Sequence, residues 1–407
     1  MEHASSIIVI ALAAFVLPLI ASRMRLPAVV LEILFGIAVG PSLLGLIHES
    51  EVMAYLAELG FLLLMFLSGF EIDFGKLERQ GSMQVVTGLG VFLLTLALAY
   101  YAADFLGHGP FVTLILATTS VGLVVPTLRG TNRTSTSLGQ AILISALIAD
   151  LLTLIGATIY AVVVEGGVGW NLLHFPALFL GMAALLLILK RVAWWYPEKV
   201  ERMFVSDDPE EIGIRASLAL MFVFVGLSHL LRVEAILGAF FAGAVFAMVF
   251  RHRGQLEQKL KGFSYGFLIP IFFIYVGVRF DLQALMQPGV LLGALTLIGV
   301  AVGLKIVAAS LLVLQRFSPR EVLAAGTLLS ARLSLVIAVA ALGARLNLVD
   351  RQLESQVILL AIVTATVAPT LFRALAPRLP SPALQADGGP VSNGKLETGL
   401  PSSASMR

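Results

Sequence analysis

The sequence predicts an all-α integral membrane protein with about thirteen transmembrane helices. Composition is the first reason, because 58% of the 407 residues are hydrophobic and only 13% are charged, whereas a soluble domain carries about 25% charged residues. The second reason is that the apolar residues gather in runs of the roughly 20 residues that a helix needs to cross a bilayer. The third is the distribution of basic residues between those runs.

Thirteen apolar runs qualify as spanning helices. In chain order they occupy residues 5–22, 27–47, 52–70, 84–104, 109–128, 137–163, 172–191, 213–230, 234–250, 264–279, 289–314, 322–343 and 354–376. The first run follows Glu2 and His3 and precedes its arginines, which is the reverse of the charge order in a cleavable signal peptide. We therefore expect it to remain as the first transmembrane helix.

Basic residues alternate between the loops that join these runs. Cytoplasmic loops of membrane proteins hold an excess of Lys and Arg, and here the odd-numbered loops hold most of them. The even-numbered loops contain only Arg232, Arg279, Arg345 and Arg351. This pattern fits thirteen spans and predicts an N-terminus outside the cell and a C-terminus in the cytoplasm.

Two segments lie outside the predicted spans. Residues 379–407 are rich in Ser, Pro and Gly and lack apolar periodicity, so we expect a disordered cytoplasmic tail after a transmembrane domain at residues 1–378. Residues 192–212 combine the aromatic pair Trp194 and Trp195 with a cluster of acidic residues. This composition predicts an amphipathic cytoplasmic linker, anchored at the membrane interface, between two halves of the chain.

The two halves resemble each other weakly. The third run leads into a Gly-x-x-x-Asp motif that ends at Asp73, and the tenth run leads into the same motif, which ends at Asp281. By the charge of the loops, the third run leaves the membrane toward the cytoplasm and the tenth toward the outside. The halves, at about 27–163 and 234–376, are therefore predicted to be inverted repeats, which in secondary transporters form a site at the membrane midplane.

Two runs at matching positions in these halves carry residues that interrupt a helix. They are Thr118, Thr119, Ser120, Gly122 and Pro126 in the fifth run, and Ser330 beside Arg332 in the twelfth. A proline removes a backbone donor and clashes with the preceding turn, and unwound backbone at membrane depth survives only beside protein or a wet cavity. Paired interruptions of this kind predict the binding site of a transporter.

Few ionisable residues fall within the apolar runs, and a charge at the bilayer centre costs at least ~2.5–3.5 kcal/mol. Asp150 lies in the middle of the sixth run, and Lys305 and Arg332 lie in the eleventh and twelfth. A carboxylate at that depth can bind either a proton or a small cation, and competition between the two suffices for exchange. We predict that Asp150 binds the ion, that Lys305 and Arg332 are either supporting or structural charges, and that Glu32 packs or pairs near the outer repeat interface.

The order and spacing of these motifs resemble those of the bacterial monovalent cation:proton antiporters, the family of sodium/proton and potassium/proton exchangers, over about residues 5–376. The resemblance is carried by Leu26-Pro27 with Glu32, Gly36 and Gly40 to Gly45; by Ala57 to Gly60 and Phe66 to Asp73; by Thr119-Ser120 and Pro126; by Leu237 to Gly243; by Pro270 to Phe273, Val276-Gly277 and Asp281; and by Lys305 and Leu329 to Arg332.

The resemblance implies a homodimer in the inner (plasma) membrane. It implies a scaffold and dimerisation domain beside a core domain that moves like an elevator and contains two crossed broken helices. In the family pattern, Asp150 binds the Na⁺ or K⁺ that is exchanged for H⁺, hydroxyls and carbonyls of Thr118, Thr119 and Ser120 complete the site, and Lys305 lies close to it.

The sequence departs from the family pattern at two places. Charge-moving members often carry two adjacent acids in the sixth span, whereas this chain has Ala149-Asp150. One acid predicts electroneutral exchange of one proton for one cation, and it leaves Lys305 without the acid it would usually pair with. After Arg332, a common Gly-Glu pair is replaced by Leu333-Ser334.

Other functions remain open at this stage. A sodium-coupled organic-anion transporter of similar fold would want polar side chains around a larger cavity, and a sensor relative would have lost transport. A channel needs a filter or a pore-lining ring, and an enzyme needs a nucleophile with a base or a metal motif; the sequence shows neither. The absence of cysteine, the scattered histidines and a net charge of only +2 argue against thiol chemistry, a resident metal or other cofactor, and a nucleic-acid partner.

Overall fold

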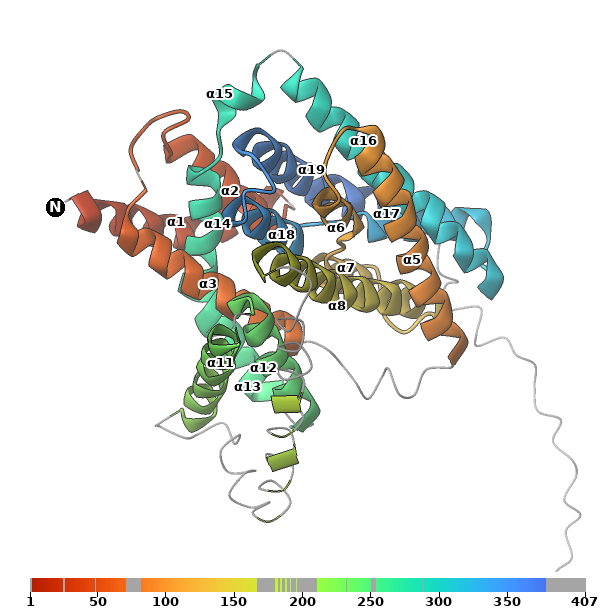
Figure 1. Ribbon diagram of the computed structural model, residues 1–407, viewed down its shortest axis with the longest axis horizontal. Coiled ribbons are helices and arrows are strands. Elements are labelled where there is room, and N and C mark those ends of the chain that lie inside the picture. Colours follow the sequence, from red (N-terminus) through yellow and green to blue (C-terminus); the bar gives the residue numbers. More distant parts are fainter. Residues whose placement is uncertain are drawn as a thin grey trace, which may run out of the picture.

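The structure, a computed structural model, is helical throughout the part of the chain that it describes (Figure 1). This part comprises residues 2–24, 26–47, 49–70, 82–166, 211–231, 233–249, 254–287 and 289–377, with a few isolated helical positions between 180 and 195. The predicted tail at 379–407, nearly all of the linker at 192–212 and most of the seventh run lie outside the described residues, as does Asp73.

Eight helical segments among the described residues are long and apolar enough to cross a membrane. They are α3 (Glu51–Phe70), α5 (Ser82–Phe105), α6 with α7 (Phe111–Ala117 and Val121–Gly130), α8 (Ser137–Gly166), α11 (Ile212–Leu230), α13 running through a π-helical turn into α14 (Gly254–Phe263 and Ile269–Val278), α16 (Val290–Ala309) with the 3₁₀ turn that follows it, and α19 (Arg351–Leu375). Each coincides with a predicted run.

The remaining spans are shorter or bent. Helices α17 (Pro319–Leu329) and α18 (Ser334–Arg345) form a ninth candidate span, bent by 46° at its break. Three further apolar helices are α1 (Glu2–Met24), of which the part Ile8–Met24 is apolar, and the shorter α2 (Ala28–Val39) and α12 (Ala235–Val249). Every predicted run except the seventh, which is mostly outside the described residues, is therefore a helix, and the predicted all-α membrane fold is confirmed.

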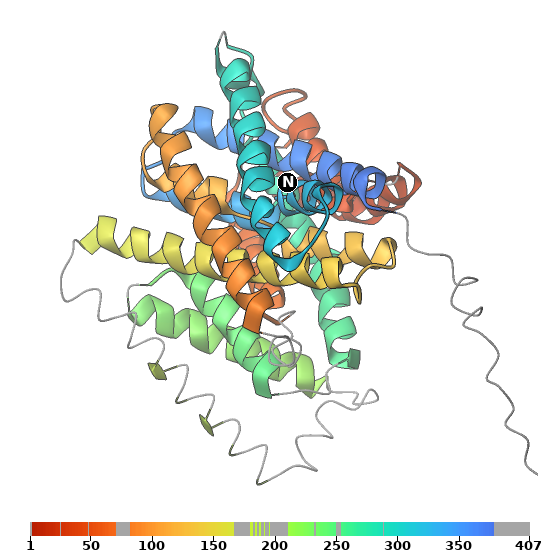
Figure 2. The same ribbon diagram turned by 90° about the vertical axis from the view of Figure 1, so that its right-hand side faces the viewer.

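The helices pack in two groups (Figures 1 and 2). In the first, which we name the scaffold group, α3 packs on α12 and α14, α2 packs on α1 and α14, and α11 packs on α12. In the second, which we name the core group, α5 packs on α6, α8 and α16, and α16 and α17 pack on α19. Few helices contact each other across the boundary, chiefly α2 with α19 and α12 with α8.

Paired glycines bring the helices of the scaffold group into backbone contact. A Cβ atom at Gly36 of α2 would meet the carbonyl oxygen of Ile274 and lie 2.9 Å from the Cα of Gly277 in α14. Gly69 of α3 and Gly243 of α12 make the equivalent crossing, because a Cβ at either one would meet a carbonyl oxygen of the other helix. Small residues permit this approach where lipid gives no hydrophobic drive for helix association. The crossings pair the second predicted span with the tenth and the third with the ninth.

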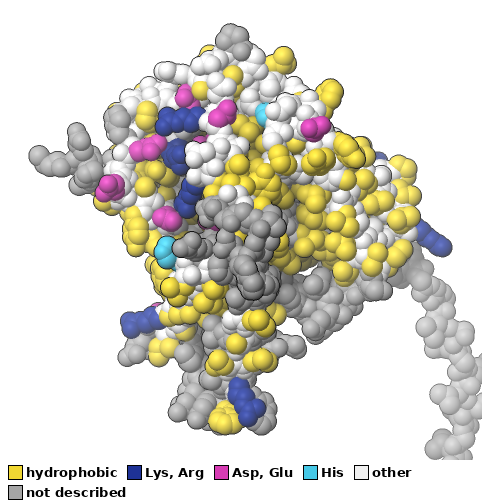
Figure 3. Space-filling model, viewed as in Figure 1, with side chains coloured by type: hydrophobic (Ala, Val, Ile, Leu, Met, Phe, Trp, Pro, Cys, Tyr) yellow, Lys and Arg dark blue, Asp and Glu magenta, His cyan; other side chains and the backbone are white. Residues whose placement is uncertain are grey.

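The outer surface suits a hydrocarbon environment. Figure 3 shows hydrophobic side chains over much of one face, with charged side chains gathered to one side of it. Large exposed apolar side chains follow α5, including Leu93, Tyr101 and Phe105, and α16, including Leu292 and Leu295. A soluble protein rarely exposes so large an apolar area, so these faces are suited to contact with lipid.

Candidate functional site

The fifth span is broken at the three hydroxyl residues. Helix α6 ends at Ala117, Thr118 and Ser120 have extended backbone, and α7 begins at Val121. The side chains of Thr118, Thr119 and Ser120 are all buried. The break exposes carbonyl oxygens at the end of α6 and N–H groups at the start of α7, and helix ends carry partial negative and positive charge, respectively. These groups need partners because the surroundings are buried.

Two cationic side chains bind the carbonyl oxygens at the end of α6. Lys305 of α16 donates to the carbonyl oxygen of Ala117 at 2.8 Å. Arg332, from the second break, donates to the carbonyls of Leu116 at 2.7 Å and Thr118 at 3.1 Å, and also to that of Ala301 at 3.0 Å. Both side chains are fully buried. Two basic side chains are thus placed at the negative end of a half-helix, where positive charge is stabilised.

The carboxylate lies at the opposite end of the break. Asp150 of α8 accepts a hydrogen bond from the backbone N–H of Val121 at 3.2 Å, at the N-terminus of α7. The positive end of a helix favours an anion, and here the acidic residue comes from a different helix. Asp150 is only half-buried, whereas the hydroxyl residues beside it are fully enclosed. Asp150 is therefore the least enclosed side chain of this site, although its Oδ1 atom is itself buried.

The second broken span meets the first at the same place. Helix α17 ends at Leu329, its cap Ser330 donates to Thr327 at 2.6 Å, and α18 begins at Ser334. The hydroxyl of Thr119 donates to the carbonyl oxygen of Leu329 at 3.2 Å and accepts from Lys305 at 2.7 Å. The two breaks are thus joined through one threonine.

The residues predicted for the site separate into three sets. The structure brings together Asp150, Lys305, Arg332, the three hydroxyl residues of the first break, and Ser330 next to Leu329. Gly122 and Pro126 are not at the break, because α7 begins before them and continues through both. The expected disruption at Pro126 is therefore wrong: the chain unwinds at Thr118 to Ser120, where Lys305, Arg332 and Asp150 supply the lost backbone partners.

Glu32 belongs to neither break. It lies on α2 in the scaffold group and is 3% exposed. Among the described residues it forms no ion pair or hydrogen bond, so of the two predicted alternatives, packing or pairing, only packing is seen there.

Sequence reasoning missed the backbone groups that complete the site and one side chain. No side chain in the sequence marks the Val121 N–H or the Ala301 carbonyl as part of the site. Thr364 of α19 donates to the carbonyl oxygens of Leu360 at 2.8 Å and Arg332 at 3.5 Å. Thr364 lies in an apolar run without a charged neighbour, so nothing in the sequence singled it out.

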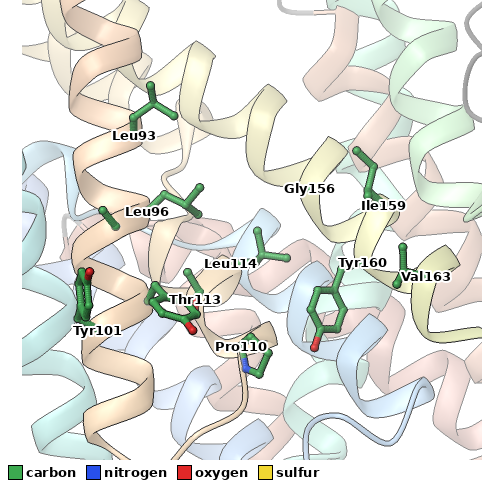
Figure 4. Close-up of a pocket in the computed structure, with 12 residues that line it drawn as sticks. Leu93, Leu96, Tyr101, Pro110, Thr113, Leu114, Gly156, Ile159, Tyr160 and Val163 are labelled. Atoms are coloured by element: carbon green, nitrogen blue, oxygen red, sulfur yellow. The ribbon is translucent and has the colours of Figure 1, made fainter. Parts of the chain in front are cut away.

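A separate groove lies between α5, α6 and α8 (Figure 4). Its volume is about 580 Å³, and its lining is mostly apolar, including Leu93, Leu96, Leu114 and Ile159, with Thr113 among the polar groups. It contains neither Asp150 nor Lys305. The groove therefore offers no charged group that could hold an organic anion.

A helical membrane protein in which two broken helices meet beside a half-buried carboxylate, as they do in the described part of this chain, has the architecture of a secondary transporter. The family description "Sodium/hydrogen exchanger, transmembrane" matches residues 10–377. The chain therefore belongs to the sodium/hydrogen exchanger family, as the sequence motifs indicated.

Individual relatives agree with this assignment. The chain is 34% identical to a putative Na⁺/H⁺ antiporter, YjbQ, of Bacillus subtilis over 94% of its own length, but it spans only 65% of that relative. It is 26% identical to probable Na⁺/H⁺ antiporter 3 of Methanocaldococcus jannaschii over 88% of this chain and 93% of the relative. The structure resembles the sodium proton antiporter MjNhaP1 of M. jannaschii, with a TM-score of 0.64, 16% identity, and coverage of 92% of this chain and 97% of that one. The last comparison shows a shared fold.

Proposed function

We propose that this protein exchanges a monovalent cation, Na⁺ or K⁺, for protons, and that Asp150 binds the two in competition. The hydrogen bond from the Val121 N–H to Asp150 carries this proposal, because it fixes a carboxylate from the middle of α8 at the N-terminus of a half-helix. That position holds an ionised carboxylate ready for a cation. Named relatives include both sodium antiporters and, at 26% identity, the potassium-efflux protein KefC of Klebsiella pneumoniae, so both cations stay in the proposal.

Several oxygen atoms at the break are already engaged by other side chains, which limits the ligands available to the cation. Arg332 and Lys305 engage the carbonyls of Leu116, Ala117 and Thr118, and Thr119 is held between Lys305 and Leu329. The Asp150 carboxylate and the hydroxyl oxygens of Thr118 and Ser120 are therefore the principal ligands of the expected set, and Thr119 acts mainly as a structural link. Oxygen ligands of this kind suit a small hard cation.

A single carboxylate leads to a simple exchange cycle. Asp150 crosses the membrane with either one proton or one cation bound, and the empty anion does not cross because an uncompensated charge is costly at that depth. One proton exchanges for one cation, so no net charge moves. The core group carries the site and moves against the scaffold group, which also provides the contact between two copies in a homodimer.

The orientation follows from the basic loops. The N-terminus faces outside the inner membrane and the C-terminus faces the cytoplasm, with inverted repeats at about 27–163 and 234–376. No catalytic role in an enzyme reaction is proposed for any of these residues. The organic-anion alternative is not adopted, because the described groove is apolar and lies apart from the charged residues of the core.

Reconstitution in liposomes tests the proposal. A proton gradient is imposed, a pH-sensitive dye is trapped inside, and Na⁺, K⁺ or Li⁺ is added with the voltage clamped or free. We expect one of these cations to dissipate the gradient at the same rate under both conditions. A rate that follows the voltage would reject electroneutral exchange, and no response from folded protein would support the transport-inactive alternative.

A further inference from the structure

The apolar groove between α5, α6 and α8 opens onto the surface that is suited to contact with lipid (Figure 4). Leu93 and Tyr101 of α5 and Ile159 of α8 line the groove and are also exposed on that surface. None of the described residues that line it is charged, and the exchange cycle at Asp150 does not use it. A ligand of this groove would therefore reach it from within the membrane.

The groove is apolar at one end and carries hydroxyl groups toward the other. Figure 4 places Leu93 in its upper part and Tyr101, Thr113 and Tyr160 lower down. Tyr101 and Tyr160 lie near the ends of α5 and α8, and tyrosine is enriched where a helix leaves the membrane. Along α5, Leu93 and Tyr101 are separated by about 12 Å, which is less than the ~15 Å of hydrocarbon in one leaflet. The groove thus extends from the head-group level into the hydrocarbon of a single leaflet.

The hydroxyl group of Thr113 indicates a ligand that accepts a hydrogen bond. Its side chain lines the groove and is 6% exposed, and its oxygen has no hydrogen-bond partner among the described residues. By contrast, the buried Thr95 of α5 donates to the carbonyl oxygen of Val91 in its own helix. A buried polar group without a partner is destabilising, so an acceptor bound in the groove would remove that penalty.

A fatty-acyl chain with its ester group matches both the shape and the polarity of the groove. The three helices pack directly on one another, so the groove is the space left between their side chains, and a helix about 10–12 Å wide does not fit there. A flexible hydrocarbon chain does fit, and the volume of about 580 Å³ is in the range of small-molecule sites. The ester carbonyl of a phospholipid lies next to its head group, at the level of the tyrosine rings.

We propose that this groove binds one fatty-acyl chain of a membrane phospholipid, and that the Thr113 hydroxyl donates a hydrogen bond to the ester carbonyl of that chain. The head group stays outside the groove, because no described lining residue carries a charge for it. The bound chain packs on α6, the half-helix whose carbonyl end is held by Lys305 and Arg332, and so stabilises the core group. Lipid binding here is separate from ion binding at Asp150 and can be measured without transport.

Ester and ether phospholipids test the role of Thr113. Delipidated protein in detergent is titrated with dipalmitoyl phosphatidylglycerol or with its dihexadecyl ether analogue, which lacks the carbonyl groups, and bound lipid is counted by native mass spectrometry. The wild type should bind the ester lipid roughly two- to tenfold more tightly, and Thr113→Val should bind the two equally. The matched control, Thr95→Val, should keep the preference. Equal binding of both lipids by the wild type, or a preference that survives in Thr113→Val, overturns the proposal.

The lipid-free protein provides an independent test. Thr113→Val removes a hydroxyl group that has no partner among the described residues, so without lipid it should unfold at the temperature of the wild type or above it. Added ester lipid should raise the unfolding temperature of the wild type more than that of Thr113→Val, because a ligand stabilises in proportion to its affinity. A lower unfolding temperature for lipid-free Thr113→Val would show that the hydroxyl already has a partner within the protein, which contradicts the proposal.

Filling the groove tests where the chain binds. Ala97→Trp places a large side chain at an exposed lining position of α5, and it should remove both the preference for ester lipid and the lipid-dependent rise in unfolding temperature. Val86→Trp, at an exposed position of α5 outside the groove, is the control and should keep both. If Ala97→Trp binds lipid as the wild type does, the proposal is wrong. If it instead loses a dimer that the wild type forms, the groove belongs to the contact between two copies.

Discussion

Lys305 and Thr119 form a 2.7 Å hydrogen bond that joins α16 to the break in the fifth span. Because Thr119 also donates to Leu329, this bond connects a buried cation with the ends of two half-helices. Lys305 therefore holds the crossing together, a role that is separate from the ion binding proposed for Asp150.

Asp150→Asn should abolish exchange and leave the protein folded. Asparagine keeps the size of the side chain and can still accept a bond from the Val121 N–H, but it can neither ionise nor take up a proton. Exchange is measured in the liposome assay, and folding is measured by thermal unfolding in detergent. Asp104→Asn, at an exposed position near the end of α5, is the control and should retain full exchange. Exchange that survives in Asp150→Asn removes Asp150 from the site.

Lys305→Met should destabilise the protein by ~2 kcal/mol or more, because hydrogen bonds to charged groups contribute about 1.5–3 kcal/mol and their buried partners lose a donor. The carbonyl oxygen of Ala117 and the hydroxyl of Thr119 both lose their bond to the ammonium group. The midpoint of chemical unfolding in detergent reports the change. Lys261→Met is the control, since its partly exposed i,i+4 pair with Glu257 is of a kind that contributes little. Equal unfolding midpoints for the two variants would show that the hydrogen bonds from Lys305 at the end of α6 do not stabilise the protein.

Gly36→Ala and Gly277→Ala should each destabilise the protein by ~1–3 kcal/mol or prevent its folding, because an added methyl group has no room in a packed contact. A Cβ at either position would meet backbone atoms of the facing helix. The chain offers a matched control in Gly299→Ala within α16, where a Cβ meets nothing within 4 Å. Alanine is the better helix former, so Gly299→Ala should be neutral or slightly stabilising. Thermal unfolding of the three variants checks the expected order.

Cross-linking between the two groups should stop exchange reversibly. Arg345, at the end of α18, is 3.6 Å from Glu58 of α3, so this ion pair joins the core group to the scaffold group. The protein contains no cysteine. The double variant Glu58→Cys with Arg345→Cys, bridged by a short disulfide-forming bis-thiosulfonate, should lose exchange and recover it when a reductant is added.

The control for this experiment lies within one group. Arg279 and Glu49 are 3.9 Å apart and both adjoin helices of the scaffold group. Bridging Glu49→Cys with Arg279→Cys should therefore leave exchange intact. If bridging Glu58→Cys with Arg345→Cys also leaves it intact, the core group does not move against the scaffold group at this contact. The ion pair itself is exposed, so its removal alone should change stability by less than about 1 kcal/mol.

Much of this protein can be predicted from patterns that are local in the chain. The length and hydropathy of each run fix a transmembrane helix, because backbone groups in hydrocarbon must be satisfied within the segment. Asp150, Lys305 and Arg332 are candidate site residues because ionisable side chains are rare within apolar runs and are costly there. The hydroxyl residues of the fifth run likewise indicated a break in its helix.

The exact place of that break could not be predicted from the same run. Pro126 is the strongest local signal for interruption, yet α7 continues through it and the chain unwinds at Thr118 to Ser120 instead. The reason is that an unwound segment forms where its backbone groups find partners, and those partners are Lys305 and Arg332, which are remote in the sequence.

The sequence by itself therefore determined that the chain spans the membrane many times, that its fold belongs to the sodium/hydrogen exchangers, and which few charged residues lie inside. Only the tertiary structure decided that Lys305 and Arg332 cap α6 while Asp150 faces the start of α7, and that Glu32 is left apart without a partner among the described residues. The physical reason is that burial and hydrogen bonding of a charge depend on the helices that surround it, and these come from distant parts of the chain.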